Sequence, residues 1–268
     1  MTGEPRSLRG ETRRFRLDLA YDGTDFEGWQ NQVRDGSMPD GRTVQAELEK
    51  ALGILVKAPC PVVGAGRTDS GVHARGQTAH FDAVTRMEGE HFLKGLNSLL
   101  PPDVRVLHCR EVGQDFHARF SALARVYHYH LVPARAALPW EVKYVHQVLS
   151  LPPLPVLNSM ASLLHGEMDF TSFAHAKDPS PSKHRYIYHA SFYPQGDRVL
   201  FQIAGNAFLW RMVRSLVGTL VDLGNRGGGT AEFGAILEAR DRRKAGPTAP
   251  GQGLYLHKVI YDEREFSF

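Results

Sequence analysis

This chain of 268 residues has almost no cysteine, and charged residues interrupt each of its long apolar segments. Its two cysteines, Cys60 and Cys109, form neither a disulfide framework nor a Cys-x-x-Cys zinc or redox motif. We expect both to be buried apolar residues. Because no stretch reaches the roughly 18 uninterrupted apolar residues of a membrane span, we expect no membrane-embedded segment.

We expect no secretory signal either. Residues 1–16 contain five arginines, but they hold no apolar core of roughly 7 to 15 residues, so the sequence predicts a soluble, cytoplasmic protein. The composition, 42% hydrophobic and 23% charged, excludes a disordered or fibrous chain and predicts a buried core. The length corresponds to roughly one large domain or two small ones.

Neither sign of charge dominates, because the net charge is only +3. The bias lies in the type of cation, since 24 of the 32 basic residues are arginine, which suits recognition of phosphate and planar groups. These arginines gather in two runs, which slightly favours a polyanionic partner over a merely solvated surface. The runs are Arg6, Arg9, Arg13, Arg14 and Arg16, and then Arg240, Arg242, Arg243 and Lys244.

The hydrophobic pattern predicts the same order of elements, β-α-β-β-α-β, in each half of the chain. In the first half, Thr43 is the expected N-cap of the first helix. We expect strands at 15–21, 62–65, 77–84 and 104–112 and helices at 43–55 and 90–100. In the second half we expect strands at 123–131, 185–193, 198–204 and 254–262, helices at 157–164 and 206–223, and an additional helix at 231–239.

This order is that of the split β-α-β, ferredoxin-like motif, so the predicted fold class is α+β with two such halves. We expect a basic N-terminal extension at 1–14, one half at 15–113 and the other at 114–268. Residues 31–42 and 133–155 are too long and too rich in glycine or proline for tight connections. They are either binding loops or simple surface insertions, and the sequence does not decide between these.

The densest local signal is the segment GAGRTDSGVHA at residues 64–74. It matches neither the Rossmann fingerprint nor the P-loop. Its glycines permit tight turning and close approach of a ligand, and it carries the acid Asp69 beside the cation Arg67. An arginine next to a carboxylate favours the ionised form. The alternative is a plain hairpin in which Asp69 caps its own turn.

Two other features carry a charge or a ligand type on an apolar background. Arg214 lies on a largely apolar predicted helix, where a cation is costly unless it is paired, directed into a cleft or extended to the surface. His128 and His130 share a strand face and could bind a metal ion, but no third ligand can be identified. We therefore expect no metal site, and we interpret both histidines as surface or groove residues.

Taken together, the motifs of this chain resemble those of the tRNA pseudouridine synthase A family, in family order across nearly the whole length. The segment at 64–82 is highly specific. The matching stretches are AYDGTDFEGWQNQ at 20–32, TVQAELEKAL at 43–52, GAGRTDSGVHARGQTAHFD at 64–82, LNSLLPPDVRV at 96–106, FHARFSALARVYHYHL at 116–131, DFTSFA at 169–174, GNAFLWRMVRSLVGTLVDLG at 205–224 and APGQGLYL at 249–256.

The resemblance implies isomerisation of uridine to pseudouridine at positions 38 to 40 of the tRNA anticodon arm, without metal or organic cofactor. It also implies two ferredoxin-like halves in a pseudo-two-fold arrangement, with antiparallel sheets lining a central cleft, and a homodimer spanning the tRNA. Residues 31–42 look longer than the usual loop of the family, and the arginine-rich N-terminus is an extension.

The resemblance also assigns roles to single residues. Asp69 takes the position of the catalytic aspartate, and Arg67 that of its adjacent arginine. Tyr127 takes that of the tyrosine stacking on the target base, and Arg214 that of the cleft arginine pairing with the aspartate. Contacts to RNA are expected from Arg13, Arg14, Arg75 and His73.

The implied chemistry agrees with these residue types. Replacing the N1–C1′ bond by a C5–C1′ bond requires a base that has left the stack, and stacking on Tyr127 would offset about 1 to 3 kcal/mol of that cost. Asp69 could attack C1′, attack C6 or remove the C2′ proton, and the sequence does not choose. No net oxidation occurs, so no redox cofactor is needed.

Tyr127 either serves mainly as a stacking platform or also uses its hydroxyl, and we expect the hydroxyl to contribute. Tyrosine has an ordinary pKa of about 10, but a nearby arginine could lower the pKa of Tyr127 and let the phenolate accept the C5 proton. The alternative function for the whole chain is a noncatalytic tRNA-binding or tRNA-folding protein on the same scaffold. Asp69 argues against it, because binding alone would not need an acid facing phosphates.

Overall fold

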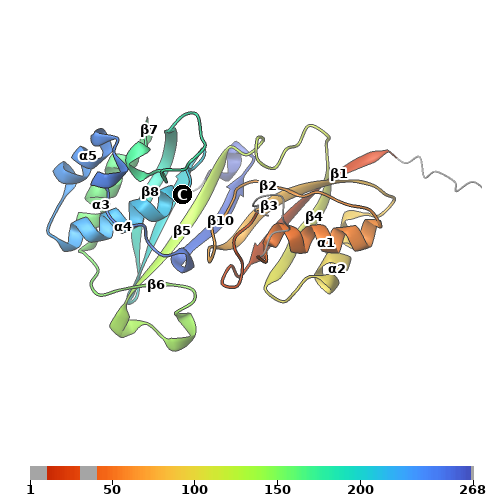
Figure 1. The fold of residues 1–268 in the computed structure, drawn as a ribbon, viewed down its shortest axis with the longest axis horizontal. Helices are drawn as coiled ribbons and strands as arrows, with labels where there is room; N and C mark the ends of the chain where they lie inside the picture. The colour runs from red at the N-terminus through yellow and green to blue at the C-terminus, as the bar shows by residue number, and fades with distance from the viewer. Residues whose placement is uncertain (1–10, 31–40, 267–268) are drawn as a thin grey trace, which may run out of the picture.

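One sheet runs through the whole molecule (Figure 1). A computed structural model describes residues 11–30 and 41–266, and the ten strands of this sheet lie within them. The N-terminal half contains β1 (Thr12–Tyr21), α1 (Val44–Val56), β2 (Val63–Gly64), β3 (His73–Val84), α2 (Gly89–Leu99) and β4 (Val104–Val112). The C-terminal half contains β5 (Ala124–Pro133), β6 (His146–Val148), α3 (Leu154–Ala161), β7 (Gly166–Asp169), β8 (His184–Gln195), β9 (Arg198–Gly205), α4 (Met212–Asn225), α5 (Thr230–Ala239) and β10 (Leu254–Ile260).

Each half has the strand order of the ferredoxin-like motif. The order is β4-β1-β3-β2 in the N-terminal half and β10-β5-β9-β8 in the C-terminal half. In both halves a helix therefore carries the chain over the sheet between strands that are not consecutive neighbours. The predicted α+β class with two ferredoxin-like halves is confirmed.

The halves meet where β10 pairs parallel to the start of β3, with Tyr255 opposite His73 and Leu256 opposite Ala74. This pairing joins the two expected sheets into one continuous sheet. The strand order repeats head to tail, rather than in the mirrored order that a two-fold axis across the sheet would give. As a result, the residues just before β3 lie beside β10 and β5 of the other half.

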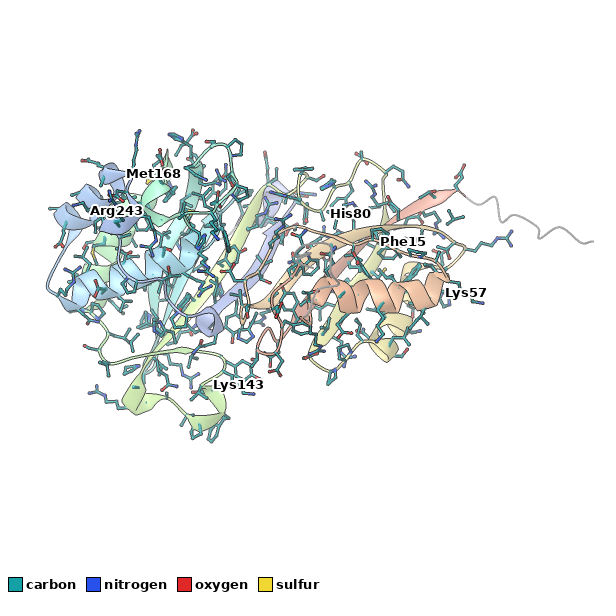
Figure 2. The ribbon with its side chains drawn as sticks, viewed as in Figure 1. Phe15, Lys57, His80, Lys143, Met168 and Arg243 are labelled. Atoms are coloured by element: carbon teal, nitrogen blue, oxygen red, sulfur yellow. The ribbon has the colours of Figure 1, made fainter. Side chains whose placement is uncertain are left out.

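Local sequence explains most of these elements. Thr43 caps α1 as expected, because its side-chain oxygen accepts a hydrogen bond from the Ala46 backbone N–H at 3.3 Å. Alternate residues of β1 are buried, and Phe15 stacks on Phe81 and packs against Phe92 of α2. Figure 1 shows α1 and α2 over one end of the sheet and α3, α4 and α5 over the other, and Figure 2 shows side chains filling the space between these layers.

Several predicted boundaries are wrong. The strand expected at 77–84 begins at His73, and the helix expected at 157–164 spans Leu154–Ala161. The helix expected at 206–223 begins at Met212, because residues 206–211 form an irregular segment that ends with Arg211 in the left-handed region at φ 61. The extension expected at 1–14 is too long, because β1 begins at Thr12 and places Arg13 and Arg14 in the sheet. The predicted loop at 133–155 contains the short strand β6.

Several expectations fall wholly or partly on residues outside the described ones. These include the first ten residues of the basic extension and residues 31–40 of the long predicted loop. Within the described ranges, none of the helices has both the length and the apolar character needed to cross a bilayer.

Candidate active site

The loop that carries Asp69 connects β2 to β3 and is held by contacts to the Thr68 side chain and to its own backbone. The Tyr21 hydroxyl is 2.8 Å from Thr68 Oγ1, and the Trp29 N–H donates to the Thr68 carbonyl at 3.0 Å. Gly28 bridges to Asp69 at φ +110, and a Cβ there would lie 2.4 Å from the Thr68 carbonyl oxygen. Only glycine can occupy that position. The loop is therefore fixed, with the Asp69 side chain 20% exposed at its surface.

Both oxygens of the Asp69 carboxylate accept a hydrogen bond from the opposite half of the molecule. Arg214 Nη1 donates to Oδ2 at 2.7 Å, and the indole N–H of Trp210 donates to Oδ1 at 2.8 Å. The pairing expected between Arg214 and Asp69 is present, and Arg214 is only 14% exposed. Charge-assisted hydrogen bonds to both oxygens orient the carboxylate and compensate its charge.

Arg214 lies in the first turn of α4, and a neighbouring segment holds its guanidinium in place. Its Nε donates to the Ala249 carbonyl at 2.7 Å, and the Ala249 N–H donates back to the Arg214 carbonyl at 3.0 Å. Residues 247–249 can lie this close because position 218 is glycine, where a Cβ would meet the Pro247 carbonyl oxygen at 1.9 Å. Arg214 is therefore directed at Asp69 and does not extend to the surface.

Trp210 is a site residue that sequence reasoning missed. Its backbone N–H donates to Asp178 at 2.6 Å, and its ring lies 4.0 Å from that of His175. Burial alone would raise the pKa of Asp178, but hydrogen bonds from Lys183, Trp210 and others hold that pKa well below its usual range. The sequence signal that could have identified Trp210 is that it does not lie on the apolar face formed by its neighbours at helical spacing.

Tyr127 is only 7% exposed and lies close enough to Asp69 for the carboxylate charge to affect its pKa. Phe208 contacts the Tyr127 ring edge to face at 5.1 Å. Burial raises the pKa of Tyr127 to about 12, while nearby Arg125 acts in the opposite direction and Asp69 adds to the rise. The expectation of a lowered pKa is therefore wrong, because burial outweighs the arginine. A base can stack on this ring only at its exposed part or after a neighbour moves.

Arg125 is the second residue that sequence reasoning missed. It is buried, and its guanidinium donates to backbone carbonyls of three segments that border the site. The acceptors are Ala65 at 3.1 Å, Ala122 at 3.1 Å, Asn206 at 2.8 Å and Arg119. Burial lowers the pKa of Arg125. Its signal in the sequence was a charge on the strand face that also carries Tyr127 and Tyr129.

Arg67 does not pair with Asp69 in this structure. Its side chain is exposed, and across residues 11–30 and 41–266 it forms neither an ion pair nor a side-chain hydrogen bond. Donors from the other half already occupy both Asp69 oxygens, so the cation that Asp69 needs comes from α4 and not from its own loop.

Three of the four residues expected to contact RNA are engaged in the fold. His73 is buried. Its Nδ1 accepts from the Gly23 N–H at 3.0 Å, and its Nε2 donates at 3.1 Å to the carbonyl of Lys143, which is labelled in Figure 2. Arg13 binds Glu111 and Glu88, and Arg14 binds Asp82 through two hydrogen bonds of 2.7 Å.

In this structure each of the three side chains already has a partner within the protein, so RNA would have to compete with these bonds, and contact at these positions stays a prediction. Arg75, the fourth, is exposed and has no ion pair within the described part of the chain. It remains a candidate for RNA contact.

The histidine pair on β5 has partners other than a metal. His128 Nε2 lies 3.0 Å from Gln202 Oε1, and its ring stacks on His257 at 3.7 Å. Burial lowers the pKa of His128 and of His130 to about 4. Among the described residues no three histidine, cysteine, aspartate or glutamate side chains are placed to hold a metal ion. Cys60 is buried, as expected, and Cys109 is partly exposed.

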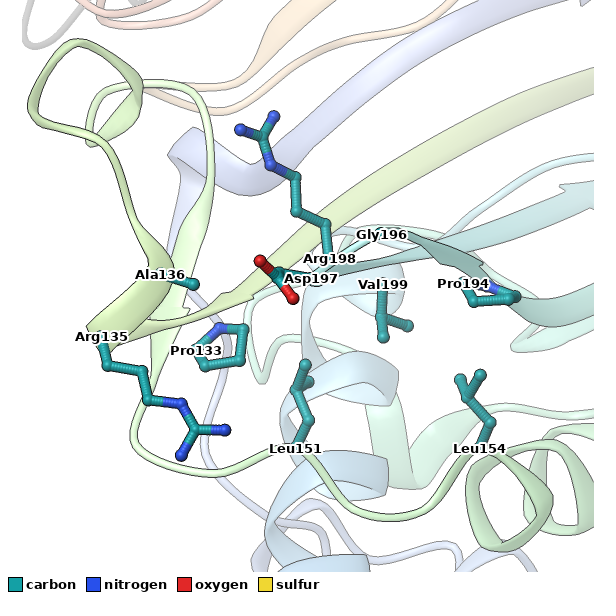
Figure 3. Close-up of a pocket in the computed structure, with 10 residues that line it drawn as sticks. All are labelled: Pro133, Arg135, Ala136, Leu151, Leu154, Pro194, Gly196, Asp197, Arg198 and Val199. Carbon is teal, nitrogen blue, oxygen red and sulfur yellow. The ribbon is translucent and has the colours of Figure 1, made fainter.

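A hollow of about 530 Å³ opens at the far end of β5 (Figure 3). Its lining includes Pro133, Arg135, Leu151, Leu154 and Arg198, and none of its lining residues belongs to the Asp69 site. The chemistry described above therefore does not extend into this hollow.

Comparisons with known proteins match nearly the whole chain. A family model described as tRNA pseudouridine synthase matches residues 19–121 and 160–262. A Treponema denticola protein named tRNA pseudouridine synthase A is 47% identical over 92% of this chain and 92% of its own. Proteins of the same name from Exiguobacterium sibiricum and Methylococcus capsulatus are 41% and 43% identical, covering 94% and 93% of this chain and 98% and 90% of their own.

Proposed function

The chain belongs to the tRNA pseudouridine synthase family, and from that premise we propose that Asp69 is the carboxylate with which it isomerises uridine at positions 38, 39 and 40 of the anticodon arm. Membership makes the protein an isomerase that acts on tRNA. The observation that carries the proposal for Asp69 is a single acid on a rigid loop, partly exposed, with each oxygen held by a donor from the other half.

This arrangement suits a reaction at the uridine glycosidic bond. The N1–C1′ bond breaks, a C5–C1′ bond forms, the C5 proton leaves and N1 gains a proton, so atoms and electrons balance without a redox partner. Asp69 attacks C1′, attacks C6 or removes the C2′ proton. In each of these routes it must present an oxygen lone pair in a fixed direction, which is what Arg214 and Trp210 provide.

Tyr127 acts as a neutral phenol in this proposal. With a pKa of about 12, its hydroxyl stays protonated at neutral pH and cannot serve as a phenolate base there. Within the described residues the hydroxyl forms no hydrogen bond, and Asp69 lies close enough to raise its pKa. Tyr127 therefore contributes ring surface and a hydrogen-bond donor to the extruded base.

Exposed arginines around the site supply the attraction to RNA. Arg67, Arg119 and Arg211 are exposed and, within the described ranges, have no ion pairs. Free cations of this kind bind phosphates and make affinity depend on salt. A second copy of the chain would extend this basic surface along the tRNA, so we include a homodimer in the proposal.

The test uses purified protein and unmodified anticodon arms that each carry one uridine, at position 38, 39 or 40, with a fourth arm whose single uridine lies elsewhere. Because pseudouridine has the same mass as uridine, the RNA is first labelled with a carbodiimide that stays attached only to pseudouridine, and mass spectrometry after nuclease digestion then maps the labelled position. We expect product in the first three arms only. Product in all four would overturn the positions proposed, and tight binding without any product would favour the noncatalytic tRNA-binding alternative.

A further inference from the structure

Phe120 is unusual among the aromatic side chains because 77% of it is exposed. It lies in the connection between β4 and β5. The ring of His117 stacks on one face at a centroid distance of 4.3 Å and an angle of 27°, and the guanidinium of Arg119 lies 5.8 Å from the ring centroid. Because 77% of Phe120 is exposed despite these two neighbours, much of the ring surface is open to a flat partner.

The turn that presents Phe120 is tied down at several points. His117 Nδ1 accepts from the backbone N–H groups of Arg119 and Phe120, each at 3.2 Å. The Ala118 N–H donates to His80 Nδ1 at 3.1 Å, and the Tyr261 hydroxyl donates to the Ala118 carbonyl at 2.6 Å. The ring is therefore pre-positioned, which reduces the entropy that binding would cost.

Arg125 places this turn against the site. One nitrogen of its guanidinium, Nη2, donates both to the Arg119 carbonyl and to the Ala65 carbonyl, where the Asp69 loop begins. The other terminal nitrogen, Nη1, donates to the carbonyl of Asn206, on the segment that leads to Trp210. Phe120 therefore directly follows Arg119, whose carbonyl accepts from the same guanidinium nitrogen as the Ala65 carbonyl at the start of the Asp69 loop.

Two exposed cations favour RNA over protein as the partner, one adjacent to Phe120 in the chain and one on the Asp69 loop that Arg125 ties to this turn. Arg119 and Arg67 are exposed and, within the described part of the chain, free of ion pairs. An exposed aromatic ring together with free cations is the combination that binds single-stranded nucleic acid, because bases stack on the ring while cations bind the phosphates.

We propose that Phe120 is a stacking platform for an unpaired base next to the target uridine, with Arg119 and Arg67 contacting the flanking phosphates. This inference rests on the proposed function, because it assumes that RNA enters at Asp69. It assigns the turn at residues 117–121 to recognition of the nucleotide beside the one that reacts.

The test compares Phe120→Ala, Phe120→Trp and Trp140→Ala. Trp140 is the matched control, because it is 71% exposed and lies in another turn, Pro139–Glu141. We expect Phe120→Ala to raise the Kd for the anticodon arm about tenfold. Phe120→Trp and Trp140→Ala should stay within about twofold of wild type. Thermal melting confirms that each variant is folded.

Arms with an abasic residue at one position beside the target uridine separate stacking from a merely structural role. At the position that Phe120 contacts, wild type and Phe120→Ala should bind the abasic arm equally. A defect that persists with every abasic arm, or Phe120→Ala binding as tightly as Trp140→Ala, would overturn the proposal. So would a change in sedimentation with Kd unchanged, which would indicate a protein interface.

The two proposals fail in different ways. If wild type forms no pseudouridine but the Kd pattern holds, the proposed reaction is wrong and the platform stands. If wild type forms pseudouridine and Phe120→Ala does not weaken binding, the platform alone is wrong.

Discussion

The two halves of this protein share one strand order but connect their second and third strands differently. In the N-terminal half, residues 65–72 form a glycine-rich loop that carries Asp69. In the C-terminal half, the same connection is a tight turn at residues 196 and 197, with Gly196 at φ 63 between the paired Gln195 and Arg198. The reactive acid therefore comes from the length and chemistry of one loop, because both halves have the same scaffold.

The connection from the third strand to the second helix also differs between the halves, but here the C-terminal half carries the site residues. In the C-terminal half, residues 206–211 form an irregular segment that presents Trp210 and leads to Arg214. In the N-terminal half, residues 85–88 lead to α2, and Glu88 there binds Arg13. One half supplies the acid and the other its donors, so the candidate site is complete only where β3 meets β10.

Removing the cation from the C-terminal half should have the largest effect among substitutions on that side. We expect Arg214→Met to lower the single-turnover rate by roughly 10²- to 10³-fold, because it leaves a partly buried carboxylate without its partner. Rapid quenching with enzyme in excess measures the rate. A rate within threefold of wild type, in a variant that melts normally, would show that the Asp69–Arg214 pair is not needed.

Tyr127 tests whether the C-terminal half supplies a ring or a base. We expect Tyr127→Ala to lower kcat/KM at least tenfold through lost stacking, and Tyr127→Phe to keep most of the activity. Since the pKa of Tyr127 is about 12, its hydroxyl remains protonated up to about pH 10, so both wild type and Tyr127→Phe should show the same profile from pH 7 to 9. A Tyr127→Phe variant as impaired as Tyr127→Ala would contradict this and restore proton transfer by the hydroxyl.

Trp210 contributes one donor and should matter less. Trp210→Phe keeps an aromatic ring beside His175 and removes the hydrogen bond to Asp69 Oδ1. We expect the single-turnover rate to fall about tenfold, the cost of one hydrogen bond to a charged group. Trp140→Phe is the control for loss of an exposed indole and should leave the rate unchanged. Equal rates for the two variants would remove Trp210 from the site.

The smallest expected effect is on the salt dependence of RNA affinity, where arginines without ion pairs can be compared with arginines bound to carboxylates. Replacing Arg67 and Arg119 by glutamine should flatten the dependence of log Kd on log salt by roughly 1.4 to 1.8, about 0.7 to 0.9 for each phosphate contact. Replacing Arg13 and Arg14 in the same way should lower the melting temperature and leave the slope unchanged, because both residues bind carboxylates in the sheet. Equal slopes for the two pairs would contradict the distinction.

The order of elements could be predicted from the sequence because hydrophobic period and caps are local properties. Thr43 caps α1, and β4 spans the predicted residues. The start of α4 could not be predicted, because the apolar pattern continues through Phe208 and Leu209 while contacts from other segments determine the path. The Arg125 guanidinium donates to the Asn206 carbonyl, and Asn206 Oδ1 accepts from the Tyr186 N–H.

The candidate site could be predicted only in part, for the same physical reason. Asp69 and Arg214 follow from their motifs, but the donor from Trp210 and the carbonyl cluster around Arg125 exist only after the halves join. Residue type also does not reveal whether a side chain is free. His73 and Arg13 have the chemistry to bind RNA, yet burial and ion pairs engage them within the sheet.

The central claim is that the Asp69 carboxylate performs the isomerisation, and Asp69→Asn tests it most directly because the side chain keeps its shape and loses its charge. The single-turnover rate of pseudouridine formation and the Kd should be measured on the same anticodon arm. The account predicts a rate at least a thousandfold below wild type with a Kd within about tenfold, since affinity comes from phosphate contacts spread over many cations. A folded Asp69→Asn variant that turns over within tenfold of wild type would contradict it.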